Sequence, residues 1–158
     1  DPARLAEELS TRKGRAALAA LHAAGTDTAG KVIIASDTTV CCAGEILGKP
    51  RDAEDARRML RLLSGRRHEV VSGVWLSLDG QKAVSHAVTA VEFDPLTDAD
   101  IAAYLATGEP FGKAGAYAIQ GRASAFIRSI TGDYFNVVGL PVNCLCNLFR
   151  DTFHEALI

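Results

Sequence analysis

Four charged residues in this sequence are suited to binding a phosphate ester. Asp37 follows a short apolar run, and Lys13, Lys49 and Lys113 each fall in or beside a segment that could border a cleft. Ammonium groups bind phosphate oxygens, and a carboxylate can hold a divalent metal ion or take a proton from water. The set therefore predicts phosphate chemistry, although each residue alone is more typical of a solvated charge or a turn.

A glycine-rich segment, residues 112–121, surrounds Lys113. Its side chains are too small to fill space by themselves, so we expect its backbone to approach a ligand. Four signatures of other enzymes are missing: the P-loop G-x-x-x-x-G-K-[ST], a G-x-G-x-x-G after the first strand, G-x-S-x-G and H-E-x-x-H. The sequence therefore gives no support to Walker-type, dinucleotide-binding, α/β-hydrolase or zincin chemistry.

Helix and strand signals alternate around these residues in the first half of the chain. A helix is predicted over residues 3–24, where apolar residues recur at helical spacing, and it carries Lys13. The apolar run 32–35 predicts a buried strand that ends just before Asp37. A second helix is predicted to begin after the cap residue Asp52 and to bury one apolar face.

The second half of the chain continues this alternation. Asp79 and Gly80 separate two apolar runs and give the strongest hairpin signal in the sequence. Further elements are a hairpin turn at 43–44, a helix capped by Thr97, a strand over 125–130 and a helix opening at Pro141. At least five strands and four interleaved helices predict an α/β fold: one domain on a mixed, twisted sheet flanked by helices.

Composition limits the class of protein. The chain has 158 residues, of which 48% are hydrophobic and 23% charged, and its net charge is −2. We expect no binding to nucleic acid, because there is no basic excess, and no membrane span, because no apolar run is long enough. The four cysteines lack zinc-site spacing, so we expect free thiols in a reducing, cytoplasmic compartment.

Seven stretches, taken together, carry a family resemblance. They are residues 36–40, 44–50, 59–65, 68–70, 104–110, 113–121 and 132–141. In this order they resemble the Maf family of nucleotide pyrophosphatases. The resemblance implies an inosine-triphosphate-pyrophosphatase-like fold with a central cleft, and hydrolysis of nucleoside triphosphates to monophosphate and pyrophosphate. It also implies a divalent cation, Mg or Mn, and a possible homodimer.

The resemblance also assigns roles to residues. Asp37 matches the family's proton acceptor and is expected at the metal ion. Lys49 matches the lysine of the family's lysine-proline motif, expected near the phosphates, and Lys13 matches the lysine of its first helix; all three are expected to be catalytic. Lys113 is expected to bind substrate. Thr38 and Gln120 match positions that read the base, and they resemble the branch that acts on dTTP and UTP. An amide such as Gln120 both donates and accepts, which suits the edge of uracil or thymine.

Two alternatives to a pyrimidine nucleotide pyrophosphatase stay open. The whole chain, residues 1–158, is expected to be a single Maf-like domain that lacks the family's first strand and its Ser-x-Ser-Pro-Arg-Arg loop. A catalytically impaired nucleotide-binding module is therefore one alternative, and the same reaction on 7-methyl-GTP is the other. Glu45 is a candidate second acid near the metal, but a solvated turn residue is the more typical role for it.

Overall fold

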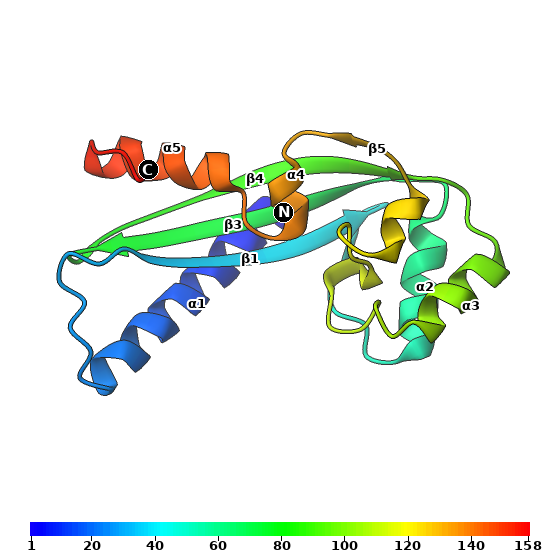
Figure 1. Cartoon of the computed structure of the whole chain (residues 1–158), viewed down its shortest axis with the longest axis horizontal. Helices are drawn as coiled ribbons and strands as arrows, with labels where there is room; N and C mark the ends of the chain where they lie inside the picture. The colour runs from blue at the N-terminus through cyan, green and yellow to red at the C-terminus, as the bar shows by residue number, and fades with distance from the viewer.

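A computed structural model describes all 158 residues of the chain (Figure 1). Its helices are α1 (Pro2–Ala23), α2 (Ala53–Leu63), α3 (Asp98–Ala106), α4 (Tyr134–Val138) and α5 (Val142–Phe153), with 3₁₀ turns η1 (Ala114–Ala116) and η2 (Arg122–Phe126). Its strands are β1 (Ile33–Cys42), β2 (Glu45–Leu47), β3 (Arg67–Leu78), β4 (Gln81–Phe93) and β5 (Ile127–Thr131). None of the helices has the length and apolar character of a membrane span.

The strands form one sheet in the order β2-β1-β3-β4-β5. The predicted α/β class, with helices flanking the sheet, is confirmed. The predicted mixed pairing is wrong, because every neighbouring pair is antiparallel. The cause lies in the turns: tight hairpins with positive φ at residues 43–44 and 79–80 fold β2 onto β1 and β4 onto β3.

Strand β1 is longer than its apolar run predicts. It continues through Asp37, which is paired with Gly73 of β3, so the expected position of Asp37 after the end of a strand is wrong. The unbroken register with β3 extends the strand past the polar residues. Its first half is also less buried than expected, with Ile34 40% exposed, because β2 pairs only with the last three residues of β1.

The two faces of the sheet carry different helices. Gly73 and Trp75 of β3 face α1, while the alternating residues Val74 and Leu76 pack against α5. In Figure 1, α1 accordingly crosses the strands on one side and α5 lies on the other. Cross-strand neighbours share a face, so Asp37 points to the α1 side and Thr38 to the side of α4 and α5.

Two hydrophobic cores flank the middle of the sheet. The larger contains 15 buried residues from the strands, α2, α3 and the 3₁₀ turns, including Val40, Val70 and Phe93. The smaller contains four: Val74 and Leu76 of β3 with Leu145 and Phe149 of α5. Strand β3 therefore runs from one core to the other.

The predicted helix caps agree with the structure, and some element bounds do not. Asp52 and Thr97 cap α2 and α3 through their side chains. The strand expected from residue 125 begins at Ile127, because η2 occupies the preceding residues. Helix α4 was not expected, since its five residues are too few to show a helical period.

Candidate functional site

All six residues expected at the site line one cavity of about 330 Å³ beside β1. They come from four parts of the chain: Lys13 from α1, Asp37 and Thr38 from β1, Lys49 from the loop after β2, and Lys113 and Gln120 from the segment between α3 and β5. The predicted convergence of one carboxylate and three ammonium groups is therefore found in the structure. The cavity reaches both faces of β1, because it is lined by Asp37 from one face and Thr38 from the other.

Asp37 and Lys13 form an ion pair at the α1 side of the cavity. Lys13 Nζ lies 2.8 Å from Asp37 Oδ2 and 3.4 Å from the carbonyl oxygen of Ser36. The Asp37 side chain is 20% exposed, and its second oxygen, Oδ1, makes no hydrogen bond to the protein. While the pair is formed, Oδ1 is the oxygen that can take a proton or contact a metal ion.

Two glycines let α1 lie close enough to the sheet for this pair to form. A Cβ on Gly14 would lie 2.0 Å from Cε3 of Trp75, and a Cβ on Gly73 would lie 2.2 Å from the carbonyl oxygen of Ala6. Side chains at either position would therefore push the helix away from β3. Since Lys13 precedes Gly14, this close approach determines where its ammonium group lies.

The loop that carries Lys49 is held on both sides. Before it, the carbonyl oxygen of Gly48 accepts a hydrogen bond from the amide of Gly115 at 3.1 Å. After it, the amide of Arg51 donates to Asp55 Oδ2 at 3.2 Å. Gly115, with φ of 70°, packs against Val40 and this loop, so its backbone serves packing, whereas its neighbours Lys113 and Ala114 line the cavity.

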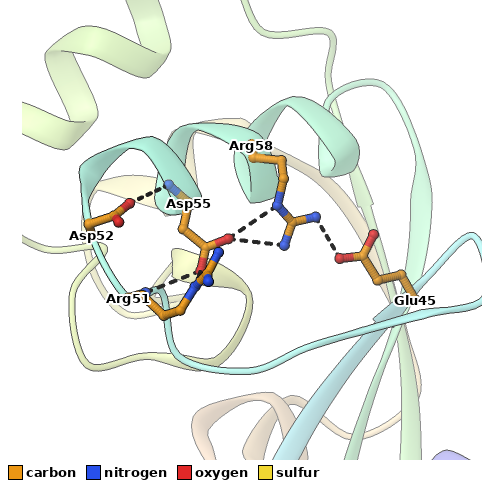
Figure 2. A network of polar contacts seen from close by, with 5 residues as sticks. All are labelled: Glu45, Arg51, Asp52, Asp55 and Arg58. Atoms are coloured by element: carbon orange, nitrogen blue, oxygen red, sulfur yellow. Dashed lines mark hydrogen bonds and ion pairs between the residues drawn. The ribbon is translucent and has the colours of Figure 1, made fainter.

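Figure 2 shows the polar network that anchors this loop to α2. Asp55 accepts from the Arg51 amide and from both guanidinium groups of Arg51 and Arg58. These hydrogen bonds, led by the one from the Arg51 amide, hold the pKa of Asp55 below its usual value. Arg58 in turn pairs with Glu45 at 2.5 Å. Glu45 does not line the cavity, which supports a structural role for it.

Gln120 is held in place by two residues that the sequence did not single out. Tyr104 donates to Glu109 Oε1 at 2.7 Å and accepts from the amide of Ala118 at 3.2 Å. Glu109 also accepts from the amides of Arg122 and Ala123, at 3.0 and 3.3 Å. Backbone on both sides of exposed Gln120 is thereby fixed. The sequence spacing of Tyr104 and Glu109 does not indicate this role, because their hydrogen bonds join α3 and the turn after it to the loop around Gln120.

The charge of Glu109 is stabilised by this arrangement. Burial by itself would raise the pKa of Glu109, but hydrogen bonds from the Arg122 amide, Tyr104 and the Ala123 amide, with the nearby Lys113 charge, outweigh it and lower the pKa. Gly121 fits against the carboxylate, since a Cβ there would lie 2.3 Å from Oε2. Tyr104 and Glu109 therefore attach the loop to the end of α3.

On the other side of β1, Thr38 lies in a buried polar network. Its Oγ1 is 2.7 Å from the hydroxyl of Ser72 on β3, and Ser72 donates to the carbonyl oxygen of Asn136 in α4 at 3.0 Å. The Asn136 amide group donates to Val70 O and Thr89 Oγ1, both at 2.9 Å. Helix α4 is thus attached to the sheet next to the cavity wall at Gly139.

The residues present fit a divalent cation only together with substrate. No group of three or more His, Cys, Asp or Glu side chains is arranged to hold a metal ion, and Asp37 is the one acid that lines the cavity. Mg²⁺ is often bound through one or two carboxylates plus phosphate oxygens and water. Asp37 Oδ1 can supply one ligand, and the phosphates of a nucleotide would have to supply others.

Comparison with known proteins agrees with this geometry. The Maf-like protein family profile matches residues 1–152. Similar proteins named dTTP/UTP pyrophosphatase include one from Ralstonia nicotianae, 53% identical over 129 residues, and one from Symbiobacterium thermophilum, 48% identical over 142 residues. A third, from Ruminiclostridium cellulolyticum, is 46% identical over 155 residues.

The match covers most of this chain and a smaller share of each relative. It covers 81%, 90% and 94% of this chain, in the same order. The corresponding shares of the relatives are 62%, 70% and 75%. The chain thus spans less than two thirds of the Ralstonia protein. With a family match over nearly all of its residues and the expected residues gathered in one cavity, the chain belongs to the Maf family.

Proposed function

We propose that this chain forms the catalytic pocket of a nucleoside triphosphate pyrophosphatase that converts dTTP and UTP to the monophosphate and pyrophosphate. The observation that carries the proposal is the gathering of Asp37, three lysines, Thr38 and Gln120 in one cavity. Three ammonium groups suit the negative charge of a triphosphate. The names of the similar proteins support the choice of dTTP and UTP.

In the proposed reaction, Asp37 is the proton acceptor. Its free oxygen, Oδ1, takes a proton from water while the water oxygen forms a bond to the α-phosphorus. The bond between that phosphorus and the bridging oxygen breaks, and its electron pair leaves with pyrophosphate. Lys13 holds Oδ2 and orients the carboxylate. Lys49 and Lys113 stabilise the negative charge on the phosphate oxygens.

A divalent cation, Mg²⁺ or Mn²⁺, is part of the proposal. Asp37 would hold it together with phosphate oxygens, and the bound ion would withdraw charge from the phosphates. Asp37 Oδ1 is the one carboxylate oxygen in the cavity without a protein partner, so metal binding and proton transfer compete for it unless Lys13 moves away. The metal is therefore expected to arrive with the nucleotide.

Substitution of Asp37 tests the reaction. Asp37→Asn keeps the shape of the side chain but removes its basicity, so kcat for dTTP and UTP should fall by about 100-fold or more while nucleotide binding persists. Pyrophosphate release with Mg²⁺ or Mn²⁺ measures kcat, and calorimetry measures binding. Asp151→Asn, an exposed acid on α5 outside the cavity, is the matched control. Unchanged turnover in Asp37→Asn would exclude Asp37 as the base.

The same assays separate the alternatives. A nucleotide-binding module is favoured by one observation, the single carboxylate in the cavity, and it would bind dTTP without releasing pyrophosphate. Faster hydrolysis of 7-methyl-GTP than of dTTP would assign the other branch. Gln120→Glu should reduce selectivity for pyrimidines more than kcat, because a carboxylate loses the donor of the amide. An equal loss on all nucleotides would instead indicate a role in packing.

We also propose that the protein works as a homodimer in the cytoplasm. Large apolar side chains are exposed on α4, the following loop and the first residue of α5: Tyr134, Phe135, Val138, Leu140 and Val142. Such a group suits a protein interface. The four cysteines are free thiols, which suits a reducing compartment. Sedimentation of the wild-type protein and of Phe135→Ser tests the dimer: the wild type should sediment as a dimer and the variant as a monomer. A monomeric wild type would contradict the proposal.

A further inference from the structure

The hydroxyl groups beside the cavity have a fixed direction of hydrogen bonding. A serine or threonine hydroxyl has one hydrogen to donate. Ser72 Oγ is 3.0 Å from the carbonyl oxygen of Asn136, which can only accept, so Ser72 donates there. The 2.7 Å bond between Ser72 and Thr38 therefore has Thr38 as its donor. The hydrogen of Thr38 points to Ser72, and the lone pair left over is what Thr38 offers to the cavity.

Burial keeps this direction from reversing. Ser72 and Asn136 are both 0% exposed, so no water can replace the Asn136 carbonyl as the partner of Ser72. Thr89, also 0% exposed, donates to the carbonyl of Asp133 and accepts from the Asn136 side chain, which holds α4 in place. If Ser72 donated to Thr38 instead, the lone pairs of Ser72 Oγ and of the Asn136 carbonyl oxygen would face each other at 3.0 Å, which is repulsive, even though the Gly139 amide also donates to that carbonyl.

A second hydroxyl on the same face behaves alike. Ser36 Oγ lies 2.9 Å from two carbonyl oxygens, those of Gly73 and Gly139, so its hydrogen also points into the protein. Ser36, Thr38 and Gly139 all line the cavity. This wall therefore offers hydrogen-bond acceptors to a ligand and no hydroxyl donor.

We propose that Ser72 is a positioning residue for base selection: it fixes Thr38 as an acceptor toward the nucleobase, so that the cavity favours a base with a hydrogen on ring nitrogen 3. Uracil and thymine carry that N–H, whereas cytosine has a bare acceptor at the same atom. A lone pair on Thr38 and a lone pair on cytosine nitrogen 3 repel each other. Neither the Thr38 nor the Ser36 hydroxyl can turn its hydrogen toward the base to remove this repulsion. This inference rests on the proposed function only in placing a nucleoside triphosphate in the cavity.

The ratio of UTP to CTP is the quantity that tests the proposal. Ser72→Ala frees the Thr38 hydrogen to point into the cavity, so Thr38 can then donate to cytosine. The ratio of kcat/KM for UTP to that for CTP should fall about tenfold, the equivalent of one net hydrogen bond. Ser77→Ala, a buried serine on the same strand outside the cavity, is the matched control and should leave the ratio unchanged.

A double substitution distinguishes this role from general support of the fold. Thr38→Val removes the acceptor itself, and adding Ser72→Ala to it should change the ratio no further. A purely structural role for Ser72 would lower kcat/KM for UTP and CTP in proportion and leave the ratio as in wild type, which would overturn the proposal. If Ser72→Ala does not fold, Ser72→Cys keeps the volume with a weaker donor, and the same fall in ratio is expected.

Equilibrium binding keeps this test separate from that of the proposed function. If wild-type protein releases no pyrophosphate, the proposed function fails, and the affinities for UTP and CTP, measured by calorimetry with Mg²⁺, take the place of kcat/KM. A wild-type preference for UTP that Ser72→Ala reduces about tenfold would still support the role of Ser72. Equal affinities in wild type, or an unchanged ratio in the variant, would overturn it. Binding of neither nucleotide would overturn both.

Discussion

Gly14→Ala probes the contact that brings Lys13 to Asp37. Gly14 is in the interior of α1, where alanine is favoured over glycine by about 1 kcal/mol. The new Cβ, however, would lie 2.0, 2.4 and 2.5 Å from three ring atoms of Trp75, where ordinary contact is 3.4–4 Å. Overpacking of this kind costs about 1–3 kcal/mol, and a clash with three ring atoms belongs at the upper end. We therefore expect a net loss of about 2 kcal/mol.

Urea unfolding and a thermal scan measure this loss. A decrease of about 2 kcal/mol corresponds to a melting temperature lower by about 4–8 °C for a domain of this size. The control is Ala17→Gly, an exposed position in the same helix, which should lose about 1 kcal/mol through propensity alone. kcat/KM should fall further in Gly14→Ala than in the control, because Lys13 is displaced. A more stable Gly14→Ala protein would refute the close packing of α1 on Trp75.

Four other predictions concern separate parts of the molecule. Burial lowers the pKa of His68 to about 4, so the stability that its neutral form contributes is complete above pH 6.5 and is lost as the pH falls toward 4; urea unfolding should show a loss of about 2 kcal/mol at pH 5 that His68→Gln lacks. Asp55→Ala should cost about 1–3 kcal/mol by leaving the Arg51 amide without its acceptor, and should raise KM; unchanged KM would show that Lys49 is positioned otherwise. Glu109→Gln should lower kcat/KM about tenfold and speed hydrogen exchange of the amides around Gln120, whereas Glu54→Gln, an exposed acid on α2, should do neither. EDTA should stop turnover yet leave the melting temperature of the nucleotide-free protein unchanged, because no cluster of acids holds a metal without substrate.

The sequence predicted which residues gather at the cavity better than it predicted the pairing of the strands. Asp37, Lys13 and Lys49 were expected at one site because they lie in short motifs that occur in the same order as in the Maf family. Each residue alone would be read as a solvated charge or a turn residue. Strand length and pairing depend on partners that lie far along the chain. The apolar run that ends before Asp37 could not show that Gly73 and Ser72 would extend β1 beyond it.

The residues that support the site were missed for a related reason. Ser72, Asn136, Tyr104 and Glu109 act through hydrogen bonds between residues 14 to 66 apart, or across a helix end, and such contacts leave no periodic pattern. Helix α4 was missed as well, because it is shorter than two turns. Local sequence reports which side chains could react, whereas their orientation is decided by tertiary contacts.

Helix α1 contributes to neither hydrophobic core, so the cavity lies where two separately packed parts of the protein meet: α1 on one side and the larger core on the other. Lys13 reaches it from α1, and Gln120 from the loops at the larger core. A nucleotide that contacts both Lys13 and Gln120 would act as a noncovalent cross-link between α1 and the larger core. At 100 times its Kd it would add about 2.7 kcal/mol of stability. Hydrogen exchange of the backbone amides of α1 and of residues 113–121 should then slow together. The bound substrate would thus make α1 and the larger core unfold as one cooperative unit.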